Sequence, residues 1–176
     1  VERRRMKRLV TCLLAAGLLS ACQTDSTPAA RHAPAARPDP QALVAAVRAA
    51  GEHGVELEVA PLRDPHVEDL LAIAESHEAA GRVREAQAAL DQALAITPQA
   101  PDLIQWKAEL AMLRKAWAEA ETLANQSWEL GPRLGGLCRR NWATIQHSRG
   151  SRGDAAGAEV ARRQVDACTV APPVRM

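Results

Sequence analysis

The chain contains no Phe and no Tyr, and its aromatic side chains are limited to four Trp among 176 residues. β-Sheets are usually rich in aromatic and β-branched residues, so this absence argues against a sheet fold. Alanine, the residue with the highest helix propensity, is abundant instead. The composition therefore predicts an all-α protein of closely packed helices.

Long runs of one charge are also missing after residue 21, and the formal net charge of the whole chain is +1 at pH 7. A strong attraction to nucleic acid or anionic lipid is not expected from such a balance. The chain has no His-Glu-x-x-His and no Cys-x2-Cys pattern, so its five scattered histidines predict no zinc site. We therefore expect no metal, no cofactor and no nucleic-acid partner.

The longest apolar stretch, Leu9 to Ala21, is only 13 residues long. A membrane-spanning helix needs about 20 apolar residues. Basic residues precede this stretch and small residues end it, which is typical of a signal peptide over residues 1–21. Plain secretion and an uncleaved anchor are the alternatives.

The stretch ends in Leu19-Ser20-Ala21-Cys22, which resembles the lipobox of bacterial lipoproteins. The resemblance implies lipid attachment to Cys22, cleavage just before it, and an extracytoplasmic mature chain anchored to a membrane. Gln23 follows the cysteine, and by similarity to enterobacterial lipoproteins this favours the outer membrane, with the protein facing the periplasm. Residues 22–40 are rich in Pro and Ala, a composition that predicts an extended tether.

Residues 41–65 predict a short leading helix, Gln41 to Ala50, that Gly51 ends, and then an extended connector. The connector contains the alternating segment Val55 to Leu62, the one strand-like stretch of the chain.

Residues 66–168 contain a repeat, because Pro98 and Pro132 lie 34 residues apart and each closes a helix-like segment. The first copy has Leu70, Ile73, Ala74, His77, Gly81, Ala86, Leu90 and Pro98, and the second has Ile104, Ala108, Ala111, Ala120, Ala124 and Pro132. This spacing is similar to the tetratricopeptide repeat family. The resemblance implies an α-α superhelix of about three helix pairs. The third copy is degenerate, with a lengthened turn expected over Arg149 to Gly153 before a helix Asp154 to Ala167, and residues 169–176 form a tail.

In that family the first helix of each pair lines a concave groove that binds peptides or partner proteins. The positions that the resemblance places in the groove are Glu68, Leu71, Glu75, Glu78, Gln105, Glu109, Met112, Arg139, Ala143 and Gln146. Glu75 and Glu109 are expected to be exposed there. Trp106 and Trp128 are further contact candidates if they are exposed. The alternative is that these side chains form only a solvated helix face.

Removal of Cys12 with the signal peptide and lipidation of Cys22 leave Cys138 and Cys168 as a spare pair. Antiparallel packing of the last two helices brings Cys138 at the start of one close to Cys168 at the end of the other, which predicts a disulfide. Two buried thiols, or a metal or redox role, are the alternatives.

No catalytic residues are expected. Cys138 and His147 lie nine residues apart on one predicted helix, so their side chains point to opposite faces. The sequence as a whole favours a lipid-anchored periplasmic adaptor for an unidentified envelope protein or peptide. The alternative is a cell-envelope enzyme, or an accessory of a cell-wall hydrolase, with an unrecognised site.

Overall fold

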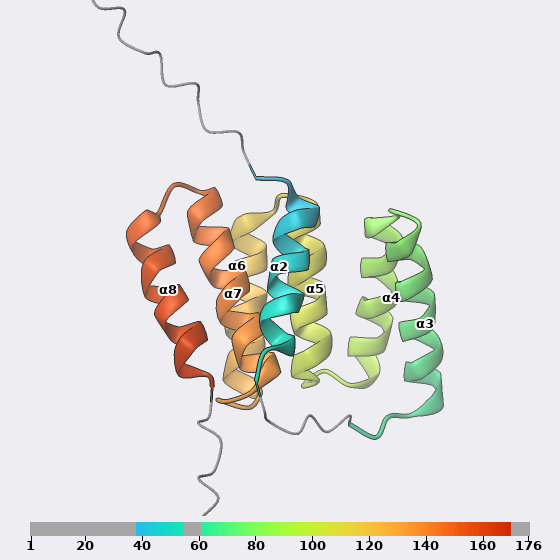
Figure 1. Cartoon of the computed structure of the whole chain (residues 1–176). Helices are drawn as coiled ribbons and strands as arrows, with labels where there is room; N and C mark the ends of the chain where they lie inside the picture. The colour runs from blue at the N-terminus through green and yellow to red at the C-terminus, as the bar shows by residue number, and fades with distance from the viewer. Residues whose placement is uncertain (1–37, 55–60, 170–176) are drawn as a thin grey trace, which may run out of the picture. The chain divides into compact units, whose positions relative to one another are not determined.

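The computed structural model describes residues 38–54 and 61–169. The signal peptide, Cys22, most of the tether, the strand-like residues 55–60 and the tail from residue 170 lie outside these ranges. The described residues form seven α-helices and no strand (Figure 1). They are α2 Pro40–Glu52, α3 Pro65–Ala79, α4 Val83–Ile96, α5 Pro101–Leu113, α6 Trp117–Leu130, α7 Gly136–Ser151 and α8 Ala155–Ala167. The all-α prediction is confirmed.

Local sequence signals fix where several helices begin. The side chains of Asp39, Asp64 and Asp154 accept hydrogen bonds from backbone N–H groups at the starts of α2, α3 and α8. Proline follows as the first helical residue in α2, α3 and α5, where its missing N–H removes no helical hydrogen bond. These short-range signals explain why helix starts are readable in the sequence.

The turns inside the three helix pairs share one geometry. The middle residue of each turn has a left-handed backbone, with φ of +72° at Gly81, +61° at Lys115 and +86° at Gly153. The expected lengthened third turn is wrong, because Arg149 to Ser151 belong to α7 and only three residues join α7 to α8. The extra residues of the third copy lengthen the helix, since α7 has 16 residues and α5 has 13.

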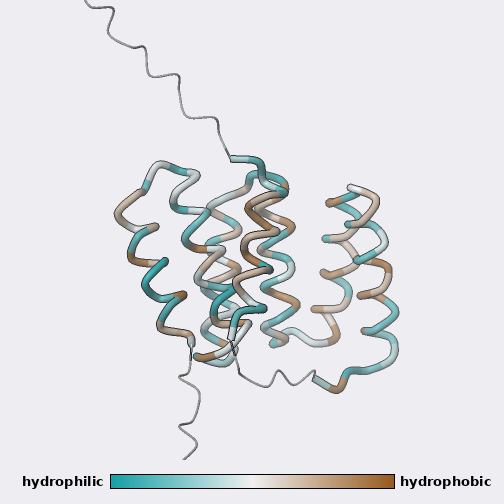
Figure 2. The backbone as a smooth tube through the Cα atoms, in the orientation of Figure 1, coloured by the Kyte–Doolittle hydropathy of each residue, from teal (hydrophilic) through white to brown (hydrophobic). Residues whose placement is uncertain are grey.

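Consecutive helices pack as the pairs α3/α4, α5/α6 and α7/α8, and each pair rests on the next. Fully buried alanines let the helices approach closely, and they occur at 74, 86, 93, 108, 111, 120, 124 and 161. Larger residues fill the space between them, as Leu90 and Leu110 do between the first two pairs and Ile145 between the last two. Figure 2 shows that apolar and polar residues alternate along the helices, as expected when each buries only one side.

The leading helix α2 does not stand apart from the repeats. It packs on α7 and α5, the first helices of two pairs, and crosses in front of them in Figure 1. Val44 and Val47 of α2 join one apolar cluster with Ala111, Met112 and Ala143. The described residues therefore belong to a single compact unit, which includes α2 as well as the repeats. Within the part of the chain that the structure describes, no helix is long and apolar enough to cross a membrane.

Candidate partner-binding groove

Cys138 and Cys168 form a disulfide, with Cα atoms 5.7 Å apart, and this confirms the predicted pairing. The bond joins the first turn of α7 to the end of α8. The backbone N–H of Gly135 donates to the carbonyl of Cys168 at 2.8 Å and reinforces the same junction. Cys138 is therefore not available as a thiol nucleophile or a metal ligand, and the last helix pair is closed covalently.

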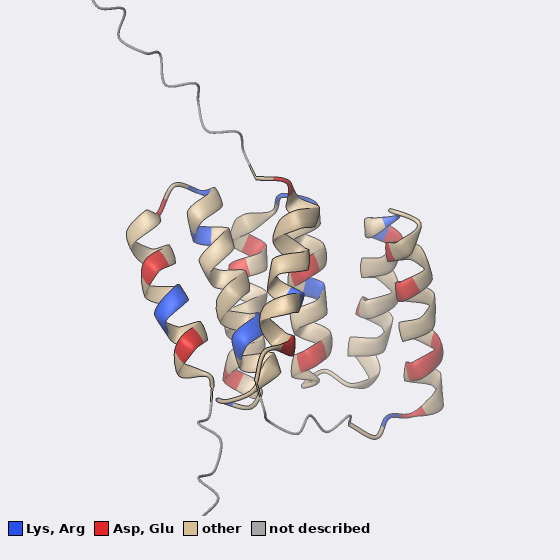
Figure 3. Cartoon of the chain, in the orientation of Figure 1, with Lys and Arg blue, Asp and Glu red and all other residues tan. Residues whose placement is uncertain are grey.

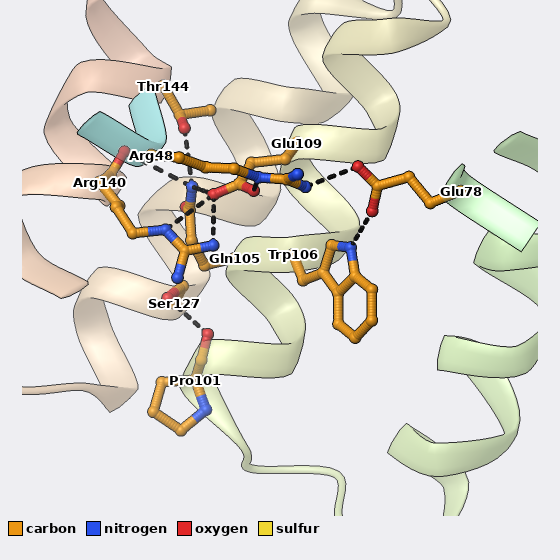
Figure 4. Close-up of polar contacts among 9 residues, drawn as sticks. All are labelled: Arg48, Glu78, Pro101, Gln105, Trp106, Glu109, Ser127, Arg140 and Thr144. Atoms are coloured by element: carbon orange, nitrogen blue, oxygen red, sulfur yellow. Dashed lines mark hydrogen bonds and ion pairs between the residues drawn. The ribbon is translucent and has the colours of Figure 1, made fainter. Parts of the chain in front are cut away.

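A buried carboxylate, Glu109 of α5, is the centre of a polar network beneath α2 (Figure 4). Its oxygens accept hydrogen bonds from Arg48 Nε at 2.8 Å, from Arg140 Nε at 2.9 Å and Nη2 at 2.6 Å, and from Gln105 Nε2 at 3.0 Å. Gln105 Nε2 also lies 2.8 Å from Thr144 Oγ1 on α7. A charge that is fully removed from water needs such partners, and here two guanidinium groups and an amide supply them.

Arg48 joins this network to the first helix pair. Its Nη2 donates to Glu78 Oε1 of α3 at 2.7 Å, and Trp106 Nε1 donates to the other oxygen of Glu78 at 2.6 Å. Burial lowers the pKa of Arg48, but the carboxylates of Glu109 and Glu78 together raise it, so the net shift is upward. One permanently charged guanidinium therefore bridges two carboxylates on two different helices.

Arg139 of α7 binds the carboxyl end of α2. Its Nε donates to the carbonyl of Ala50 at 3.0 Å and its Nη2 to that of Gly51 at 3.2 Å. The last carbonyls of a helix have no partner inside the helix, so this side chain satisfies them. A Cβ at Gly51 would lie 2.8 Å from Cγ and Cδ of Arg140, which explains why a residue without a side chain suits this contact.

The expected groove residues differ in exposure. Five of the six on α5 and α7 are buried, and they are Gln105, Glu109, Met112, Arg139 and Ala143. Gln146 of α7 is half-buried, as are Leu71 and Glu78 of α3, whereas Glu68 and Glu75 of α3 are exposed. The expected exposure of Glu109 is therefore wrong. The physical reason is that α2 covers α5 and α7, while the α3 edge, where Figure 3 shows acidic residues along the helix, stays open.

Arg48 and Thr144 are the network residues that sequence reasoning missed. A signal for Arg48 was present, because it follows Val44 by four residues and Val47 by one and so lies on the apolar side of α2. A charged residue on an apolar helix face indicates a buried ionic partner. The contact candidate Trp106 is half-buried and donates to Glu78, and Trp128 packs edge-to-face on Trp142 at 5.3 Å between ring centroids.

A cavity of about 1030 Å³ opens at one end of the groove. The end of α2 and the first turns of α5 and α7 line it, with Gly51, Pro101, Leu134, Leu137 and Arg140 among the lining residues. Among all the described residues, no group of three or more His, Cys, Asp or Glu side chains is placed to hold a metal ion. The chemistry that this arrangement offers is ion pairing, hydrogen bonding and apolar contact.

Comparison with known proteins agrees with this geometry. A tetratricopeptide repeat family model matches residues 77–133. The structure is similar to that of the globular C-terminal domain of LpoP from P. aeruginosa, with 27% identity and a TM-score of 0.57, over 60% of this chain and 99% of that one. A search of curated proteins finds no match. The repeat period, the paired helices and the two comparisons agree: this chain carries a tetratricopeptide repeat domain.

Proposed function

We propose that this protein is a membrane-anchored periplasmic adaptor whose repeat domain holds a partner protein of the cell envelope. The single observation that carries the proposal is that the first-helix face of the repeats binds a helix, namely α2, through Arg48 and two valines. A surface that recognises a helix by both charge and shape is suited to protein recognition.

The proposed location rests on two features. The Leu19 to Cys22 motif provides a lipid attachment site, and the Cys138–Cys168 disulfide is of the kind that persists in oxidising compartments such as the periplasm. Residues 23–39 then separate the anchor from α2 and act as the tether.

Site-specific photo-crosslinking in intact cells tests the proposal. A photoreactive residue replaces Glu75 on the open edge of α3, and a matched chain carries it at Gln92, an exposed position on the second helix α4. We expect a discrete protein adduct from position 75 and none from position 92. The adduct should disappear with Cys22→Ser, which also leaves an unprocessed mass in intact-protein mass spectrometry.

Equal labelling from both positions would contradict a groove-edge contact. A normally processed Cys22→Ser chain that still forms the adduct would contradict the lipid anchor.

A further inference from the structure

The contacts of α2 show what kind of helix this groove accepts. Arg48 donates from Nε to one carboxylate and from Nη2 to another, on α5 and α3. A guanidinium has donors in a fixed planar arrangement that can serve two carboxylates at once, whereas the ammonium of lysine is a compact charge on a flexible stem and fixes the geometry less well. Val44 and Val47 fill the adjoining apolar surface and are 4% and 0% exposed. The recognised pattern is therefore Val-x-x-Val-Arg on one face of a helix.

The groove retains internal partners for its carboxylates when α2 is left out of account. Glu109 still has Arg140 and Gln105, and Glu78 still has Trp106. A buried acceptor pays its full desolvation penalty when it is left without a partner, and neither carboxylate is left so by the loss of α2. Because these contacts do not depend on α2, the groove can keep its structure when another helix replaces α2.

α2 is also attached less extensively than the elements beneath it. Two valines are its fully buried side chains, and the opposite side, with Ala45, Ala46 and Ala49, is exposed. By contrast, α7 packs against α6, α8 and α2 and is joined to α8 by the disulfide. Elements with few buried apolar contacts open locally at a lower free energy than well-buried ones.

We infer that α2 occupies the surface that binds the partner. The partner supplies an amphipathic helix with an arginine beside small apolar residues, and this helix takes the place of α2. The carboxylates of Glu78 and Glu109 recognise that arginine. The inference rests on the proposed function and adds to it the chemical class of the partner segment and its mode of entry. It also means that α2 competes with the partner.

A labelled peptide with the sequence of residues 39–54 is the probe, and its binding to the detergent-solubilised full chain is measured by fluorescence anisotropy. Val47→Ala in the protein weakens its own α2 without altering Glu78 or Glu109. We expect the peptide to bind the Val47→Ala chain at least tenfold more tightly than the wild-type chain. An Arg48→Gln peptide should lose at least tenfold in affinity, and an Ala46→Ser peptide, changed on the exposed side, should bind like the parent.

Glu78→Gln in the Val47→Ala protein completes a double-mutant cycle with the two peptides. This substitution should weaken the binding of the parent peptide and leave the affinity for the Arg48→Gln peptide unchanged, because that peptide lacks the ion pair already. Equal binding of the parent and Arg48→Gln peptides, or no binding to any chain, would overturn the inference. Self-association of the Val47→Ala chain through exchanged α2 helices would assign the groove to a second copy and overturn it too.

Hydrogen exchange of the wild-type chain gives an independent result. Amides of α2 should exchange faster than those of α7, and protection of α2 equal to that of α7 would contradict displacement. If the peptide fails to bind while crosslinking from position 75 persists, this inference fails and the adaptor function stands. If the crosslink is lost while the peptide still binds, the adaptor function fails and the recognition of an arginine-bearing helix stands.

Discussion

Arg48 Nε and Glu109 Oε2 lie 2.8 Å apart although 61 residues separate them along the chain. This contact unites the leading helix with the middle repeat, and the second contact of Arg48, to Glu78, extends it to the first repeat. The groove that the family resemblance leaves open is thus filled over α5 and α7 by the chain itself. The open part is the α3 edge and the cavity at the end of α2.

Glu109→Gln should destabilise the fold by about 2–3 kcal/mol, because it leaves Arg140 and Arg48 without their shared carboxylate. The loss is modest because the Arg48 side chain is 41% exposed and partly solvated. Glu75→Gln, on the exposed edge of α3, should change stability by no more than about 0.5 kcal/mol. Urea denaturation followed by circular dichroism measures both, and equal effects would contradict the buried role of Glu109.

Loss of the disulfide should destabilise the last helix pair by about 3 kcal/mol, because the bond closes a loop with a sequence separation of 30. Cys168→Ser in a Cys138→Ser background avoids a lone thiol. A terminal pair has a repeat neighbour on one side only, so hydrogen exchange should increase first in α8. Exchange that rises first in α3 would show that stability is distributed differently.

Lys115→Gly should stabilise the domain by about 1 kcal/mol, because Lys115 has φ of +61° and a side chain disfavours this left-handed backbone. Gly81→Ala makes the reverse change in the equivalent turn, where a Cβ meets nothing within 4 Å. It should therefore cost about 1 kcal/mol through the backbone alone. Thermal denaturation compares the melting temperatures of the two variants with that of the wild-type chain. Shifts of the same sign would refute the proposal that both turns need the same left-handed backbone.

His147 predicts a pH dependence of stability. Burial lowers the pKa of His147 from its ordinary value of 6.5, so the unfolded chain binds a proton at higher pH than the folded one. The free energy of unfolding should therefore fall as pH drops below about 6.5 and level off below the pKa of the folded state. His147→Gln should reduce this loss between about pH 7.5 and pH 5.5.

Urea titrations at the two pH values measure this effect, and His66→Gln on the exposed start of α3 is the control. An identical pH dependence in the wild-type and His147→Gln chains would contradict the burial of a neutral imidazole.

The sequence predicts the helices and their pairing well because the signals are local. Proline and aspartate mark the helix starts, and Gly81 and Gly153 mark two turns. The disulfide also follows from helix order, since antiparallel neighbours bring Cys138 and Cys168 together. Lys115 shows the limit of such signals, because the same turn forms there without glycine.

The groove is less predictable because its state depends on contacts between distant segments. The family resemblance predicts that Glu109 and Arg139 line the groove, but it does not reveal that both side chains contact α2. An alanine-rich helix with two valines carries little information about where it packs. The charge of Arg48 was the available clue, and its two acceptors become evident only in three dimensions.

Quantitative crosslinking from position 75 in envelopes, compared between the wild-type chain and Val47→Ala, tests the central claim most directly. If a partner helix takes the place of α2, weakening α2 should raise the yield of the partner adduct several-fold at equal protein abundance. Mass spectrometry of the adduct should identify a partner segment with an arginine beside small apolar residues on one helical face. An unchanged or lower yield with Val47→Ala, at preserved helical content, would contradict the account.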